Sequence, residues 1–131
     1  MVVDTSAVLA ILLGEPERHD FIELLADEHD PLISAATLLE ASIVMDVRQG
    51  RDGVDDLDAL LAALAIRPVA VDVAQSHVAR EAYARFGTGR SPAALNFGDC
   101  FSYALARTMG RPLLFKGENF ALTDVMPAAA G

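Results

Sequence analysis

An α/β fold with a parallel central sheet covered by helices on both faces is predicted by the order of the segments. Short apolar runs that suit strands, such as "MVV", "PLIS" and "RPLLF", alternate with longer segments of helical periodicity. Capping residues precede several helical segments and glycines follow them, as is typical of helix boundaries. With 131 residues, of which 53% are hydrophobic, we expect a single domain over residues 1–131.

The first half of the chain contains two of the predicted strands and four helices. Gly14 and Gly50 end two of these helices, and Ser34 can cap the helix that follows it. In the second helix, charged residues lie opposite a stripe with Phe21 and Leu25, as expected for a surface helix. The predicted elements are strands at 1–3 and 31–34 and helices at 6–13, 16–29, 35–49 and 54–65.

The second half continues the alternation. Asp72 and Gln75 form a plausible capping box at the start of one helix. A loop rich in glycine, "GTGRSPAAL", precedes the last helix. The predicted elements are strands at 68–71 and 111–115, helices at 73–86 and 97–109, and a weak strand at 125–126. The sheet would therefore have four to five short strands, with ligands expected beyond their carboxyl ends.

The charge balance excludes a protein that binds nucleic acid with its whole surface. Nineteen acidic residues against ten basic ones give a net charge of −9, whereas such proteins are basic. Nucleic-acid contacts would be local, with Arg85, Arg90 and Arg107 as candidates. The single cysteine forms no internal disulfide, and no run approaches the ~20 apolar residues that span a bilayer. Without a basic leader before Asp4, we expect a cytoplasmic protein with no membrane association.

Three carboxylates occupy positions where acids are unusual. Asp4 directly follows the first strand, although it can cap the next helix, as can the "TS" after it. Glu40 lies on a largely apolar helix face with no basic residue nearby in sequence; a position at the edge of that face remains an alternative. Asp99 begins a nearly all-apolar helix, where a capping box with Asn96 would also account for it.

Taken together, the three acids predict a metal site. Carboxylates crowded at one edge of a sheet repel one another, and a divalent cation relieves that repulsion. Ligands that are all oxygen favour Mg²⁺ or Mn²⁺ over zinc. The three histidines, which we place on surface helices, have no metal-binding spacing: His19, His29 and His77.

More oxygen ligands follow the last main strand in "KGENFALTD". Glu118, Asn119 and Asp124 lie just past the strand end, where each alone is a typical loop residue. Lys116 could contact a phosphate or pair with an acid. We take Glu118 as the fourth acid and Asp124 as the second choice, which leaves a second, weaker metal position open.

These residues resemble a PIN-domain ribonuclease, and more narrowly a VapC-type toxin of a bacterial type II toxin–antitoxin pair. The resemblance covers essentially the whole chain and is carried by "DTSAVLAIL", "PLISAATLLEA", "LNFGDCFSYALA" and "PLLFKGENFALTD". It implies a PIN-like three-layer fold. It also implies that Asp4 and Asp99 are the principal metal ligands, that Glu40 is the third acid, and that Glu118 or Asp124 completes the set.

The implied function is a toxic, Mg²⁺- or Mn²⁺-dependent endoribonuclease, a hydrolase acting on RNA phosphodiester bonds. Water activated by the cation attacks the phosphate, leaving a 5′-phosphate and a free 3′-hydroxyl. The resemblance also implies a VapB-type antitoxin as inhibitor and a homodimer. Transfer, ribosomal and messenger RNA all remain candidate targets.

Alternative hypotheses come from other protein classes. A receiver-type phosphoacceptor domain also has a doubly wound sheet and an acidic pocket, but it would need paired acids after the first strand, where Asp4 stands alone. The haloacid-dehalogenase phosphatases fail for a similar reason. The remaining alternative to the ribonuclease is a catalytically idle protein that only binds an antitoxin arginine among its acids.

Overall fold

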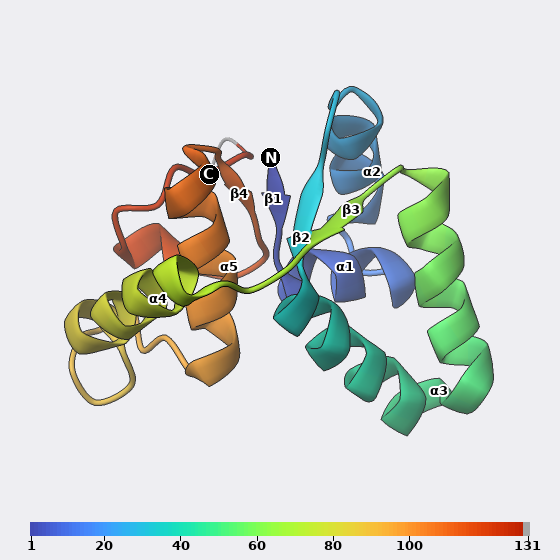
Figure 1. The fold of residues 1–131 in the computed structure, drawn as a ribbon. Helices are drawn as coiled ribbons and strands as arrows, with labels where there is room; N and C mark the ends of the chain where they lie inside the picture. The colour runs from blue at the N-terminus through green and yellow to red at the C-terminus, as the bar shows by residue number, and fades with distance from the viewer. Residues whose placement is uncertain (130–131) are drawn as a thin grey trace.

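The computed structural model describes residues 1–129 and has a four-stranded, fully parallel sheet of order β3-β2-β1-β4 at its centre (Figure 1). Val2 pairs with both Leu32 and Leu113, so β1 lies inside the sheet. The candidate strand at 125–126 adds only one bridge, between Leu113 and Pro127. The strands are β1 (Val2–Val3), β2 (Leu32–Ser34), β3 (Arg67–Val69) and β4 (Leu113–Leu114).

The helices cover both faces of the sheet, as predicted for the α/β class. They are α1 (Thr5–Leu12), α2 (Arg18–Ala26), α3 (Ala35–Ala63), α4 (Val73–Phe86) and α5 (Phe97–Met109), followed by the 3-10 helix η1 (Phe120–Leu122). In Figure 1, α1, α2 and α3 lie on one side of the strands, and α4 and α5 lie on the other.

The alternation of side chains along the strands explains this division. Val3, Ile33 and Leu114 point to one face and pack in a core with α1, α2 and α3. The preceding residue of each strand points to the opposite face, where Leu32 and Leu113 pack with α4, α5 and the C-terminal segment. Successive residues of a strand face opposite sides, so each short strand contributes to both cores.

Side-chain caps set the predicted helix boundaries. Ser34 accepts the backbone N–H of Ala36 at the start of α3. Gly50 has a φ of 65° and a ψ of −152°, which breaks α3 into the two helices expected from the sequence. At α4 the capping box is only half formed. Asp72 accepts the backbone N–H of Gln75, but the Gln75 amide donates to the carbonyl of Ala70 instead of returning to residue 72.

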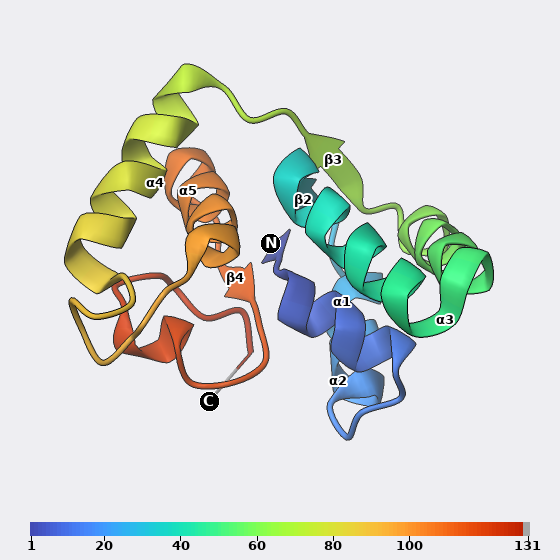
Figure 2. The same cartoon turned by 90° about the horizontal axis from the view of Figure 1, so that it is seen from below.

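The carboxyl end of the sheet is where the helix starts gather. Seen from this end in Figure 2, α1 and the first half of α3 run side by side, with the start of α5 across from them. Asp4 follows β1 directly, and α3 follows β2 without a loop. Within the described residues, no helix combines enough length and apolar character to cross a membrane.

Candidate active site

Asp4 links the end of β1 to two helices. Its Oδ2 accepts hydrogen bonds from the backbone N–H of Ser6 at 3.0 Å and from the Ser6 hydroxyl at 2.7 Å. Its Oδ1 accepts the hydroxyl of Ser102, on α5, at 2.6 Å. Only 3% of Asp4 is exposed. Within residues 1–129 the donors that bind it are all neutral, so no basic side chain accompanies this buried acid.

Hydroxyl groups connect this carboxylate to its surroundings. The Ser6 hydroxyl oxygen accepts the backbone N–H of Lys116, just past β4, at 3.0 Å. The Ser102 and Thr37 hydroxyl oxygens lie 3.1 Å apart in the core. Because Ser102 gives its only hydroxyl proton to Asp4, Thr37 must be the donor in that pair. The network therefore joins β1, β4, α3 and α5 around one carboxylate.

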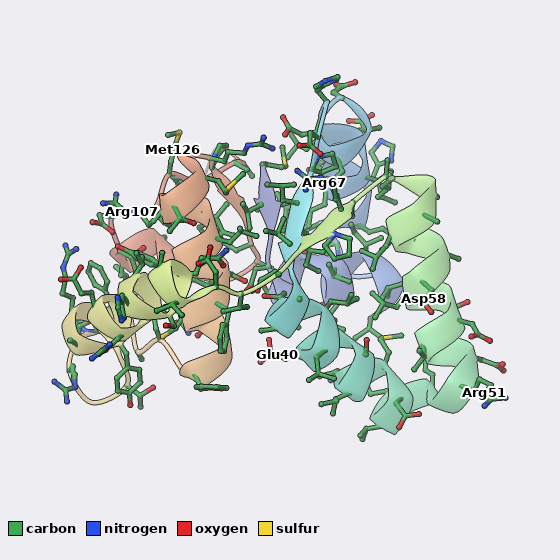
Figure 3. The ribbon with its side chains drawn as sticks, viewed as in Figure 1. Glu40, Arg51, Asp58, Arg67, Arg107 and Met126 are labelled. Atoms are coloured by element: carbon green, nitrogen blue, oxygen red, sulfur yellow. The ribbon has the colours of Figure 1, made fainter. Side chains whose placement is uncertain are left out.

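Glu40 projects from the first half of α3 toward α5 (Figure 3). The hydroxyl of Thr5, next to Asp4, donates to its Oε1. Its Oε2 lies over the backbone of Gly98, where a Cβ atom would come within 2.0 Å of it. The side chain is half-buried and has no ion pair among residues 1–129. Glu40 thus lies where α3 contacts the first turn of α5.

Asp99 forms the expected capping box and still contributes a charge to the site. Its Oδ2 accepts the backbone N–H of Asn96 at 3.0 Å, and the Asn96 side chain accepts the backbone N–H of Asp99 at 2.9 Å. Burial raises the pKa of Asp99 to about 6, and the nearby charges of Asp4 and Glu40 add to that rise. Asp99 therefore holds its proton more strongly than an ordinary aspartic acid does.

The three acids make a negative site without a basic partner. Asp4, Glu40 and Asp99 form no ion pair with Lys, Arg or His within residues 1–129. The described chain has no ready-made cluster of three His, Cys, Asp or Glu ligands. A Mg²⁺ ion, however, is typically held by one or two carboxylates and several waters. The all-oxygen donors and the raised pKa of Asp99 fit such an ion.

Comparison with known proteins decides the family. A model of the PIN domain matches residues 1–126. The chain belongs to the PIN domain family. This PIN domain is 50% identical to a Ribonuclease VapC of Mycolicibacterium smegmatis over 125 residues, which are 95% of this chain and 97% of the relative. It is 46% identical over 129 residues to Ribonuclease VapC30 of Mycobacterium tuberculosis, covering 98% of both chains. The predicted resemblance to VapC ribonucleases is confirmed.

A solved structure confirms the fold class of the PIN domain. The crystal structure of Mycobacterium tuberculosis VapC20, described as a toxin that cleaves the sarcin-ricin loop, matches with a TM-score of 0.77. The match covers 95% of each chain at 20% sequence identity. At that identity the likeness concerns the architecture: a parallel sheet with helices on both faces.

Glu118, the predicted fourth acid, is not joined to Asp4, Glu40 or Asp99 by any hydrogen bond within residues 1–129. Glu118 is exposed in the loop after β4, and its carboxylate has no hydrogen bond or ion pair within residues 1–129. Asn119, also exposed, precedes η1 without capping it through its side chain. Glu118 stays a prediction, supported by its place beyond the carboxyl end of β4.

Asp124, the second choice for that position, has other partners. Its carboxylate accepts the hydroxyl of Tyr103 at 2.5 Å and pairs with Arg85 at 3.2 Å and Arg107 at 3.8 Å. Partial burial opposes its charged form, but Tyr103, Arg107 and Arg85 outweigh this and hold the pKa of Asp124 below its usual value. Asp124 therefore belongs to an ion cluster between α4, α5 and the C-terminal segment, and we remove it from the ligand set.

The basic residues pair with acids, which for Lys116 is the second of the two expected possibilities, although its partners lie outside the group of Asp4, Glu40 and Asp99. Lys116 pairs with Glu15 and, at 3.4 Å, with Glu17 in the connection between α1 and α2, so its ammonium group is taken up by those acids. Two of the candidate RNA contacts, Arg85 and Arg107, pair with Asp124.

The histidines lie nearly where the sequence predicted, and the single cysteine lies in the core. The histidines are all exposed, although His29 follows α2 instead of lying on it. Cys100 is a buried thiol; burial raises its pKa to about 11, and the charge of Asp99 adds to this. A thiol of that pKa is no nucleophile at neutral pH.

Sequence reasoning missed the hydroxyl residues that hold the acids. Ser102 and Thr37 are buried, and the first of them binds Asp4 across 98 positions of sequence. One signal was present: Ser102 is a lone small hydroxyl within the apolar run "CFSYALA", three residues after Asp99 and therefore close to its face of the helix. Thr5 and Ser6 were visible only as alternative helix caps.

Proposed function

We propose that this PIN domain is the toxic endoribonuclease of a toxin–antitoxin pair and hydrolyses RNA phosphodiester bonds with a divalent cation. The observation that supports the proposal is that Asp4 and Glu40 lie near enough to Asp99 for their charges to raise its pKa, while no basic side chain within residues 1–129 pairs with any of the three. The ribonuclease names of the curated relatives support RNA as the substrate class.

Asp4 and Asp99 are the proposed principal ligands of Mg²⁺ or Mn²⁺, with Glu40 as the third acid and Glu118 as the fourth. When bound, the cation would offset phosphate charge and activate water for attack on phosphorus. The chain's own groups orient that chemistry. Ser6 and Ser102 fix both oxygens of Asp4, Thr5 holds Glu40, and the capping box leaves Oδ1 of Asp99 without a hydrogen bond from residues 1–129.

The partners we propose follow from the VapC family. A VapB-type antitoxin would inhibit the enzyme, the active form would be a homodimer, and the enzyme would act on cytoplasmic RNA, with transfer RNA as one candidate target. The uncompensated negative site favours an inhibitor that places an arginine among the acids, since a guanidinium group binds carboxylates in a bidentate manner.

The test uses purified protein freed of antitoxin and labelled single-stranded RNA. Cleavage is measured with Mg²⁺, with Mn²⁺ and with EDTA for the wild type, Asp99→Asn, Glu118→Gln and a control, Asp58→Asn. Asp58 is exposed on the second half of α3, away from Glu40 (Figure 3). Cleavage that needs a metal, persists in the control and is lost in Asp99→Asn supports the proposal. Absence of both cleavage and metal binding in folded protein contradicts it.

A further inference from the structure

An aromatic groove runs between α4 and the start of α5, and neither the family comparison nor the proposed chemistry assigns it a role. Its volume is about 550 Å³, within the range of small-molecule sites. Phe97 and Phe101 form one wall, and Tyr83 and Arg80 belong to the other. We call these four residues, with the space between them, the aromatic groove.

Phe97 is the unusual member. Phe97 is 79% exposed, and its phenyl group extends the apolar lining of the groove to the surface. A neighbouring aromatic residue restrains the ring of Phe97. Phe101 meets it edge to face, with centroids 4.9 Å apart and planes at 87°. Because the Asn96–Asp99 capping box encloses residue 97, the backbone below the ring is fixed as well.

The position of this ring relates the aromatic groove to the chemistry. Phe97 is followed at once by Gly98, which lies against Glu40, and then by Asp99. With 3.6 residues per turn, Phe101 lies about 60° around α5 from Gly98. Asp99 lies about 100° beyond Gly98 in the other direction, on the side of α5 turned away from the aromatic groove. An extended strand of RNA whose phosphate reached the acids would therefore have to pass around the start of α5 to bring a neighbouring nucleotide onto Phe97.

The charge of this region favours a polyanion. Arg80 and Arg90 are the cations of this region to be considered, because the third arginine of residues 73–98, Arg85, pairs with Asp124. Arg80 lines the aromatic groove and pairs with no acid among residues 1–129. Arg90 lies over the ring of Tyr83, 5.9 Å from its centroid. RNA brings phosphates that these two arginines can bind.

We propose that the aromatic groove binds an unpaired RNA base beside the scissile phosphate, with Phe97 as the stacking surface and Arg80 as a phosphate contact. This inference rests on the proposed endoribonuclease function. Aromatic side chains bind bases of single-stranded RNA in this way because every base has a π face, so the subsite favours unpaired over duplex RNA.

The experiment measures binding apart from cleavage. Asp99→Asn protein in EDTA is titrated, by fluorescence anisotropy, with labelled oligoadenylate of about 12 nucleotides and with an abasic RNA of equal length. Phe97→Ala should weaken binding of oligoadenylate about five-fold or more and leave the abasic RNA unaffected. Phe97→Tyr should bind like its parent. Arg80→Ala should weaken binding of both RNAs and reduce the salt dependence.

Val47→Ala is the matched control, because Val47 is an apolar residue on α3 with nearly the same exposure, 80%. Four results would overturn the base site. The first two are an unchanged affinity of Phe97→Ala for oligoadenylate, and an equal loss of affinity for oligoadenylate and abasic RNA. The third is that the parent protein does not bind oligoadenylate. The fourth is a change of molar mass in Phe97→Ala that accounts for its loss of affinity. The last result would make the groove a contact between copies of the chain.

The proposed function is tested separately by the cleavage assay. Metal-dependent cleavage with unchanged binding in Phe97→Ala would remove only the base site. Binding that depends on Phe97, without cleavage under any metal condition, would leave the base site standing and contradict the endoribonuclease.

Discussion

The carboxylate of Glu40 covers Gly98 so closely that no other residue fits at position 98 without moving it. A Cβ there would come 2.0 Å from Oε2 and 2.8 Å from the carboxyl carbon of Glu40. Gly98 lies in the first turn of α5 and carries no positive φ. The glycine is therefore required by the approach of a carboxylate to α5, not by backbone conformation.

Gly98→Ala should separate stability from activity. The atoms that must move belong to the end of a flexible side chain, and alanine favours helix, so the melting temperature should change little or rise slightly. Metal-dependent RNA cleavage should fall, because Glu40 is displaced from Asp99. Thermal denaturation and cleavage assays on one preparation check both parts.

Gly53→Ala is the contrasting control. A Cβ at Gly53 would come 2.6 Å from the carbonyl oxygen of Met45, a backbone atom across the break at Gly50. We expect a lower melting temperature with cleavage per folded molecule retained. If Gly98→Ala destabilised the protein as much as Gly53→Ala, the explanation through a mobile carboxylate would be wrong.

The pKa of Asp99 predicts how stability depends on pH. Because the pKa is about 6 when folded and 3.8 ordinarily, the folded state binds more protons between these values, and stability falls as pH rises through that window. In EDTA, Asp99→Asn should therefore melt higher than the wild type at pH 7.5. The difference should shrink as pH is lowered toward 4. Equal melting temperatures at pH 7.5 would contradict the raised pKa.

The same pair of proteins should respond differently to a divalent cation. Addition of Mn²⁺ should raise the melting temperature of the wild type, because a ligand that binds only the folded state stabilises it. The rise should be smaller in Asp99→Asn. An equal rise in both proteins would place the binding site elsewhere.

Ser102→Ala should disturb Asp4 without touching the ligands themselves. The change removes a buried hydrogen bond to a carboxylate, for which we expect a loss of about 1–3 kcal/mol in the free energy of unfolding. As a positioning residue, Ser102 should also affect the Mn²⁺ concentration needed for half-maximal cleavage. Thr108→Ala removes a hydroxyl that bonds only to the backbone of α5, and it should leave that concentration unchanged.

Asp124→Asn should reveal a structural role. Its depressed pKa means that the charged form stabilises the fold above the ordinary value of 3.8 and that this contribution is lost as pH falls below it. The variant should melt lower than the wild type at pH 7 and converge with it in acid. Cleavage per folded molecule should be retained, and loss of Mn²⁺ binding would return Asp124 to the ligand set.

Features that depend on nearby residues were accessible from the sequence. The caps at Ser34 and Asn96, the break at Gly50 and the four strands follow from local patterns, because each is decided by residues within one or two turns. Asp72 and Gln75 show the limit of such patterns. Both residues of a capping box are present, but the Gln75 amide donates to the carbonyl of Ala70 instead of the backbone of residue 72.

Features that depend on tertiary contacts could not be predicted from the sequence. The sequence marks Asp124 as an acid beyond a strand, yet only the fold brings Arg85 and Arg107 to it. The hydroxyl of Ser102 reaches Asp4 only because α5 crosses the end of β1. Long-range pairing of this kind is set by packing geometry, which periodicity and spacing do not encode.

The place of β1 inside the sheet has a consequence for synthesis. Its neighbour β4 and the Ser102 hydroxyl that orients Asp4 both come from the last third of the chain. A nascent chain emerging from the ribosome therefore contains Asp4 and Glu40, with their partners Ser6 and Thr5, well before Ser102 and Gly98 are made. Folding of the complete site must wait for α5 and β4. A chain that still lacks α5 and β4 would therefore hydrolyse no RNA, and the site would assemble only after both elements have been synthesised.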